Sequence, residues 1–288
     1  MTDVQTHTLS AGGATITYDL HGAGLSEDVL FLIGSPMDAS GFATLASHFT
    51  DRTVATYDPR CVSRSPRTDG AEQTTPEEHA DDLRRVIEAL GARNVDVFAS
   101  SGGAVNALAL VAAHGDLVRT LVAHEPPAVP VLPDREQALA ACADVRETYL
   151  REGQGPAMVK FILLATRKGP VPAGWAEEPV PSPEQFGMPA GDDGSRDDPL
   201  LGQNMIPCTG YRPDFDALRA ASTRIVVGVG EESAGELAHR AGLGVAAGLG
   251  ADAVLFPGDH SGFLGGEFGQ QGRPVEFAKA LRDVLDAD

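Results

Sequence analysis

The feature that most constrains the fold is an alternation of short apolar runs with segments of helical periodicity. Residues 28–35 (DVLFLIGS) are continuously apolar and end in Gly-Ser, which is typical of a strand buried on both faces. Residues 75–91 instead space their apolar side chains as a helix does, with acidic residues in the first turn and Gly91 as a stop signal. Because strands that alternate with helices form parallel sheets covered on both faces, we predict an α/β protein.

The same alternation extends over most of the chain. The nearly all-apolar segment 102–115 predicts a buried helix, and no internal repeat suggests a solenoid or a propeller. Further strands are predicted, the first of them antiparallel, over residues 14–22, 52–58, 94–100, 118–125, 224–230 and 251–258.

The alternation breaks once, between residues 128 and 213. Two helical stretches, 134–151 and 155–167, lead into residues 168–200, which hold seven prolines and the single tryptophan, Trp175. This composition also fits a disordered linker. Because regular β/α order resumes afterwards, we expect a cap inserted over the sheet, since long loops in compact domains often act as lids.

The expected organisation is therefore a core domain of residues 1–127 and 214–288 with a cap of residues 128–213. The charge balance, 22 Lys and Arg against 41 Asp and Glu, gives a net charge of −19, which argues against nucleic acid and an anionic membrane as partners. No apolar run is long enough to span a bilayer, and no signal peptide is evident. Three scattered cysteines then suggest reduced thiols and a cytoplasmic location.

The sharpest local signal is the segment Phe98–Gly103 (FASSGG), between a predicted strand and a predicted buried helix. A nucleophile at Ser101 needs a tight strand-to-helix turn, and small residues at Ala99 and Gly103 allow the strand and helix to approach closely. The free N–H groups at a helix N-terminus favour developing negative charge. The alternative is an ordinary serine N-cap.

A serine nucleophile needs a base, and His260 lies in a loop just past the last predicted strand. Such loops overhang the carboxyl edge of an α/β sheet, where binding sites gather. The alternative is a surface loop histidine. His124 is interpreted as structural, and the other histidines are expected to be solvated: His7, His21, His48, His79, His114 and His239.

An oxyanion hole needs two N–H donors directed at one point. Gly102 would supply the first donor, and the loop after residues 28–35 the second. Pro36 has no N–H, so Ser35 is favoured over Met37, although a plain Gly-Ser-Pro turn would need no function.

Together these segments resemble the α/β-hydrolase family over almost the whole chain. The matching motifs, in the family's order, are Ile33–Pro36, Tyr57–Arg60, Ala99–Gly103 and Gly258–Phe263. The resemblance implies the α/β-hydrolase fold, a mostly parallel eight-stranded sheet with helices on both faces and an inserted cap.

Three positions depart mildly from the family pattern, because Ala99 and Cys61 replace the usual Gly and Ile33 replaces the usual His. Each place needs only a small residue or a backbone N–H. Cys61, with Arg60 and Arg64 nearby, is either a somewhat activated thiol or an unremarkable loop cysteine.

The family usually takes its acid, an Asp, from the loop after the seventh strand, where this chain has Ser233. Glu125 ends the sixth strand, which neighbours the seventh, and the chain is similar here to certain haloalkane dehalogenases and zearalenone-type lactonases. Glu125 is therefore the expected triad acid, with Glu231 and Glu232 as alternatives.

The resemblance implies an esterase or lactonase that works through an acyl-enzyme, because related dehalogenases and epoxide hydrolases attack with Asp rather than Ser. Alternatives are a cofactor-free perhydrolase (haloperoxidase) or acyltransferase on the same triad, and a hydrolase-like binding protein. No cofactor or metal is implied, the expected partner is a mostly apolar ester or lactone, and a homodimer is possible. Candidate pocket walls, or else core residues of the cap, are Met158, Phe161, Ile162, Leu163, Leu164 and Trp175.

Overall fold

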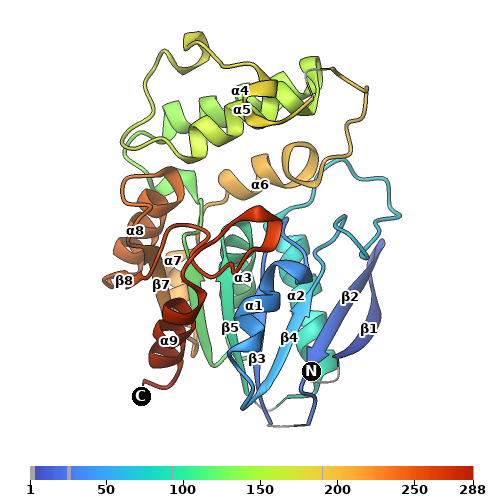
Figure 1. Cartoon of the computed structure of the whole chain (residues 1–288). Coiled ribbons are helices and arrows are strands. Elements are labelled where there is room, and N and C mark those ends of the chain that lie inside the picture. Colours follow the sequence, from blue (N-terminus) through green and yellow to red (C-terminus); the bar gives the residue numbers. More distant parts are fainter. Residues whose placement is uncertain (1–3, 25–26, 93, 190, 288) are drawn as a thin grey trace.

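The computed structural model describes residues 4–24, 27–92, 94–189 and 191–287. Its centre is an eight-stranded sheet in the order β1-β2-β4-β3-β5-β6-β7-β8, as Figure 1 shows. Strands β1 and β2, and β2 and β4, pair antiparallel, and all other neighbours pair parallel, which confirms the predicted α/β-hydrolase fold. The strands are β1 Val4–Ala11, β2 Ala14–His21, β3 Asp28–Ile33, β4 Thr53–Tyr57, β5 Asn94–Ser100, β6 Thr120–His124, β7 Arg224–Gly230 and β8 Val254–Phe256.

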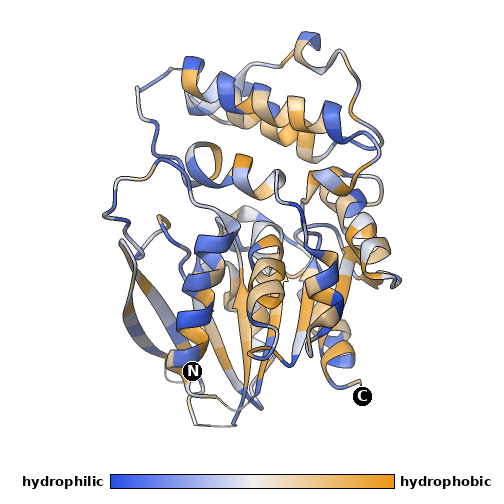
Figure 2. Cartoon of the chain, turned by 180° about the vertical axis from the view of Figure 1, so that it is seen from behind, coloured by the Kyte–Doolittle hydropathy of each residue, from blue (hydrophilic) through white to orange (hydrophobic). Residues whose placement is uncertain are grey.

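The two edges of the sheet differ from the residue-by-residue prediction. Strand β1 was not identified from the sequence, because it is polar and largely exposed and pairs only with β2. Strand β8 is shorter than the predicted 251–258, since it pairs with β7 only from Val254 to Phe256. The central strands are apolar on both faces, as the predicted burial requires (Figure 2).

Helices cover both faces of the sheet. One face carries α2 Pro76–Leu90, α3 Gly102–His114, α7 Phe215–Ala220 and α8 Leu237–Leu249, and the other carries α1 Ala43–Ser47 and α9 Pro274–Leu285. Helix α2 forms as predicted: Thr75 and Glu78 make a reciprocal capping box, and Gly91 ends the helix in the left-handed region at φ 61°. Helix α3 is buried along nearly its whole length, also as predicted.

Residues 128–213, which we call the insertion, lie beyond the carboxyl edge of the sheet (Figure 1). They form α4 Arg135–Glu152, α5 Gln154–Ala165, a π-helical turn Pro199–Asn204 and α6 Met205–Thr209. An apolar cluster of its own, which includes Trp175, joins the insertion to Leu237 and Ala241 of α8. Residues 168–189 and 191–200 pack along α4 and α5 through short 3₁₀ turns.

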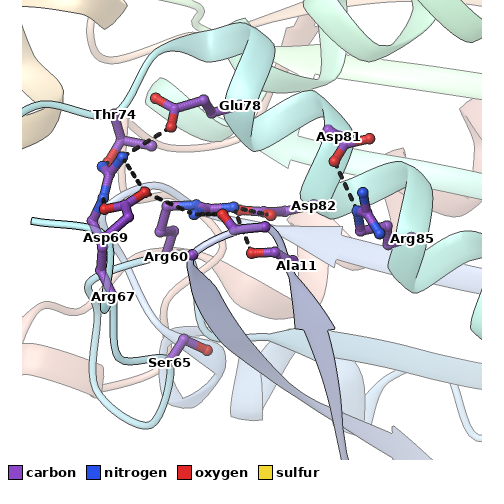
Figure 3. Close-up of polar contacts among 12 residues, drawn as sticks. Ala11, Arg60, Ser65, Arg67, Asp69, Thr74, Glu78, Asp81, Asp82 and Arg85 are labelled. Carbon is purple, nitrogen blue, oxygen red and sulfur yellow. Dashed lines mark hydrogen bonds and ion pairs between the residues drawn. The ribbon is translucent and has the colours of Figure 1, made fainter. Parts of the chain in front are cut away.

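A buried ion pair fixes the loop after β4 to the rest of the core (Figure 3). The Arg60 guanidinium donates to both carboxylate oxygens of Asp82 on α2, at 2.9 and 2.6 Å, and to the carbonyls of Ala11 and Gly12. Both charged side chains are almost completely buried. Arg60 thereby ties the first hairpin, the loop after β4 and α2 together.

Candidate active site

Ser101 occupies the sharp turn between β5 and α3, with φ 57° and ψ −127°. This left-handed backbone is unfavourable for a residue with a side chain and is found where function requires it. The Ser101 N–H donates to the carbonyl of His124 at 2.9 Å, which holds the turn against β6. A Cβ on Gly103 would lie 2.5 Å from the Ile33 carbonyl oxygen, so glycine is needed there for the close approach of α3 to the sheet.

The N-terminus of α3 lies directly against the loop that follows β3. A Cβ on Gly102 would lie 2.5 Å from the Ser35 carbonyl oxygen, so only glycine permits this contact. The first N–H groups of a helix have no acceptor within the helix and are available to an anion. Ser35, Pro36, Ser101 and Gly102 line one cavity, whereas Met37 packs beside Gly41 and is not among the residues that line it.

Glu125 follows β6 directly and also has a left-handed backbone, with φ 48°. Its side chain is fully buried, and its Oε2 lies 2.6 Å from His260 Nδ1. The other oxygen, Oε1, accepts the Gly230 N–H at 2.9 Å and the Ser233 hydroxyl. Three groups therefore hold the carboxylate: the Gly230 N–H at the end of β7, the Ser233 hydroxyl just beyond it, and His260 in the loop after β8.

The electrostatics of this pair favour a charged carboxylate beside a basic imidazole. Burial alone would raise the pKa of Glu125, but the hydrogen bond and charge of His260 outweigh burial and lower it. Burial alone would lower the pKa of His260, but the hydrogen bond and charge of Glu125 raise it above its ordinary value. Glu125 can thus orient the imidazole and stabilise its protonated form.

Ser101 and His260 face the same cavity, which has a volume of about 410 Å³. No hydrogen bond joins Ser101 to His260 in the part of the chain that the structure describes. Such catalytic hydrogen bonds are often long and tighten only in the complex with substrate. The arrangement brings a serine hydroxyl, an imidazole backed by a carboxylate, and a free helix N-terminus to one cavity.

The alternative acids lie elsewhere. Glu231 and Glu232 are exposed, and their carboxylates are 3.6 and 3.8 Å from Arg273 Nη1. Ser233, at the position where the family usually has Asp, is fully buried and donates to Glu125. No role is predicted for Ser233 from the sequence. Its place three residues after Gly230, where the family usually has the acid, is the signal that indicates one.

Two histidines contradict the expectation of solvation. His79 and His239 are buried, because α2 and α8 are covered on those sides by other segments. His79 Nε2 lies 2.6 Å from Asn204 Oδ1 in the π-helical turn, and burial lowers the pKa of His79 to about 4. His124 is buried among phenylalanine rings and contacts Ser100 Oγ at 3.2 Å, as a structural residue should.

Just under half of the residues that line the cavity come from the insertion. Phe161 and Leu164 of α5 line the cavity and also pack in the insertion's own apolar cluster. Met158, Leu163 and Trp175 pack in that cluster without lining the cavity. Cys142 and Cys208 also line the cavity. Cys61 lies outside it, and burial raises the pKa of Cys61 against the opposing charge of Arg67, which argues against an activated thiol.

Within the described ranges, no three His, Cys, Asp or Glu side chains are grouped so that they could hold a metal ion. The same residues include no helix that is both long and apolar enough to cross a membrane.

Comparison with known proteins identifies the family of the chain. The sequence model of the family described as "alpha/beta hydrolase fold" matches residues 16–161, half of the chain. The chain belongs to the alpha/beta hydrolase fold family. It is 27% identical over 288 residues to a protein called "Uncharacterized hydrolase YraK" of Bacillus subtilis (strain 168), a match that covers 98% of this chain and 96% of that protein.

Two solved structures show how far the shared fold extends. An esterase from Thermogutta terrifontis, solved with malate bound, is 20% identical with a TM-score of 0.67, and 98% of each chain is covered. The enol-lactonase from Burkholderia xenovorans LB400 is 16% identical with a TM-score of 0.66, covering 98% of this chain and 100% of that one. At these identities the likeness shows the fold alone, so the activity of this alpha/beta hydrolase must be argued from its own site.

Proposed function

We propose that the chain is a serine hydrolase that cleaves carboxylic esters or lactones through an acyl-enzyme. The observation that carries this proposal is the Glu125–His260 pair, joined at 2.6 Å and facing the same cavity as Ser101. Ser101 also has the strained backbone typical of an exposed nucleophile between a strand and a helix. The esterase and enol-lactonase among the structural neighbours are consistent with this chemistry.

The residues support the following sequence of steps. Ser101 Oγ attacks the ester carbonyl while His260 Nε2 accepts the hydroxyl proton, and Glu125 stabilises the resulting imidazolium. The negative charge on the carbonyl oxygen is met by the backbone N–H groups of Gly102 and Ser35. The carbon–oxygen bond to the leaving group then breaks, and His260 returns its proton to the departing alcohol.

Water completes the cycle. His260 removes a proton from a water molecule that attacks the acyl-enzyme, and the tetrahedral intermediate collapses to release the acid and restore Ser101. The walls contributed by Phe161, Leu164 and Met205 favour a mostly apolar acyl group.

The decisive experiment is rapid mixing with p-nitrophenyl acetate. An acyl-enzyme mechanism predicts a burst of nitrophenol close to one equivalent per chain, an acetyl group on the peptide that contains Ser101, and loss of both in Ser101→Ala. Ser100→Ala, a matched change in the neighbouring residue, keeps the burst. Binding of the ester without turnover in the unmodified protein would instead support a binding protein.

A further inference from the structure

The charged side chains that line the active-site cavity are mostly negative. Within the described part of the chain, His260 is the only basic side chain that lines the cavity, and no Lys or Arg does so. Two carboxylates, Glu236 and Asp259, line it as well. A substrate that carries a carboxylate would therefore meet two negative groups and no fixed cation apart from the catalytic histidine.

The Glu236 carboxylate is not held in an ion pair within the described residues. It is half-buried, and its carboxylate makes no hydrogen bond or ion pair there. The charges of Lys168 and His260 act on the carboxylate, but neither residue forms an ion pair with it, and Lys168 does not line the cavity. Burial and the nearby charge of Glu125 raise the pKa of Glu236, as expected for a carboxylate that faces an apolar space. Asp259, in contrast, is exposed and accepts the Ser261 N–H at 2.8 Å.

Glu236 places its negative charge at the N-terminal end of α8. Glu236 is the N-cap residue of α8, and the first residues of that helix, Leu237 and Ala238, also line the cavity. A helix N-terminus carries a partial positive charge and unpaired N–H groups, so it favours an anionic group of a ligand. Here the protein's own carboxylate stands at that end and offsets the attraction.

We propose that Glu236 excludes negatively charged substrates from the cavity, so that the enzyme acts on esters whose acyl and alcohol parts carry no negative charge. This inference rests on the proposed ester hydrolysis at Ser101. Glu236 is a specificity residue and takes no part in the bond-making steps. Replacing it with a neutral residue removes one negative charge and exposes the positive end of α8 to the substrate.

The test compares two esters of the same shape. p-Nitrophenyl 5-methylhexanoate is uncharged, and the p-nitrophenyl monoester of glutaric acid has a carboxylate in place of the terminal isopropyl group. The wild-type protein should prefer the uncharged ester in kcat/KM by at least about tenfold, equal to about 1.4 kcal/mol. Glu236→Gln should raise the ratio of charged to uncharged ester at least about fivefold, mainly through KM, and high salt should reduce the wild-type preference because salt screens charges.

Two further variants make the result unambiguous. Glu236→Ser removes the charge and supplies a preferred N-cap residue. An effect that both the Gln and the Ser variants show therefore comes from the lost charge and not from a weakened helix end. Glu232→Gln removes a nearby exposed carboxylate outside the cavity lining and should leave the ratio within about twofold of wild type.

The outcomes separate this inference from the proposed function. If the uncharged ester is not hydrolysed in a Ser101-dependent way, the proposed function is wrong. If it is hydrolysed but both Glu236 variants keep the wild-type ratio, or if wild type prefers the charged ester, the assignment of Glu236 is wrong.

Discussion

Glu125 and His260, which lie 135 positions apart in the chain, meet with 2.6 Å between Oε2 and Nδ1. The contact forms because parallel strands β6 and β7 end at the same edge of the sheet, and the loop after β8 overhangs that edge. The acid therefore comes from the tip of β6, while the last residue of β7 and the loop after it supply donors to it. The two strand tips together make one acid site.

The first prediction concerns the identity of the acid. Glu125→Gln keeps the shape but removes the charge that stabilises the imidazolium, so kcat should fall by about 10⁴-fold. Glu231→Gln and Glu232→Gln should each cost less than about tenfold, or about 1.4 kcal/mol of barrier. Steady-state hydrolysis of a p-nitrophenyl ester measures all three, and an inactive Glu231 or Glu232 variant beside an active Glu125 variant would reverse the assignment.

A second prediction follows from the direction of the His260 pKa. His260 acts as a base only when neutral, and Glu125 raises its pKa above the ordinary value of 6.5, so kcat/KM should fall as the pH drops through that raised pKa. In Glu125→Gln the hydrogen bond and charge are lost while burial remains, and the acid limb of the residual activity should move to lower pH. An acid limb at the same pH in both proteins would contradict this origin of the shift.

Local patterns explain why part of the molecule was predictable. The capping box and Gly91 define the ends of α2, and the small residues around Ser101 define the turn between β5 and α3. Each of these patterns involves residues that are close together in the chain, so it can be recognised from the sequence alone. Strand β1 lacks such a signal, because its residues are mostly polar and exposed. It becomes a strand by pairing with β2.

The remaining features depend on contacts between distant segments. His79 is buried because Asn204, 125 residues later, lies against it. The partner of Ser233 is likewise 108 residues away in the chain. Helical spacing does place His79 on the same face of α2 as Leu83 and Val86, which was the available signal for its burial. No local pattern indicates that Ser233 meets Glu125, so its role was not predicted.

A third prediction tests the buried ion pair of the core (Figure 3). Asp82→Asn would remove the carboxylate that Arg60 contacts at 2.6 Å and leave only that of Asp69, which is 3.9 Å away. Breaking a buried ion pair typically costs about 3–5 kcal/mol of unfolding free energy. The adjacent Asp81 is a matched control, because its pairs with Arg84 and Arg85 are exposed and such pairs contribute about 0–1 kcal/mol. Urea unfolding of Asp82→Asn and Asp81→Asn measures the difference. Equal losses of unfolding free energy in the two variants would show that burial of the ion pair does not matter.

The last prediction concerns Ser233 as a positioning residue for Glu125. Its hydroxyl and the Gly230 N–H hold Oε1, while Oε2 faces His260. Ser233→Ala removes one donor to a buried carboxylate, and a hydrogen bond to a charged group is worth about 1.5–3 kcal/mol, so kcat should fall by roughly tenfold to a hundredfold. KM should change little, because Ser233 is not among the residues that line the cavity.

The pH profile separates this positioning role from simple loss of stability. Without the Ser233 donor, the Glu125 carboxylate has one partner fewer, accepts more strongly from His260 and raises the pKa of His260 further. The acid limb of kcat/KM should therefore move to higher pH in Ser233→Ala, opposite to its movement in Glu125→Gln. A lower melting temperature with an unmoved acid limb and unchanged kcat would show instead that Ser233 only supports the fold.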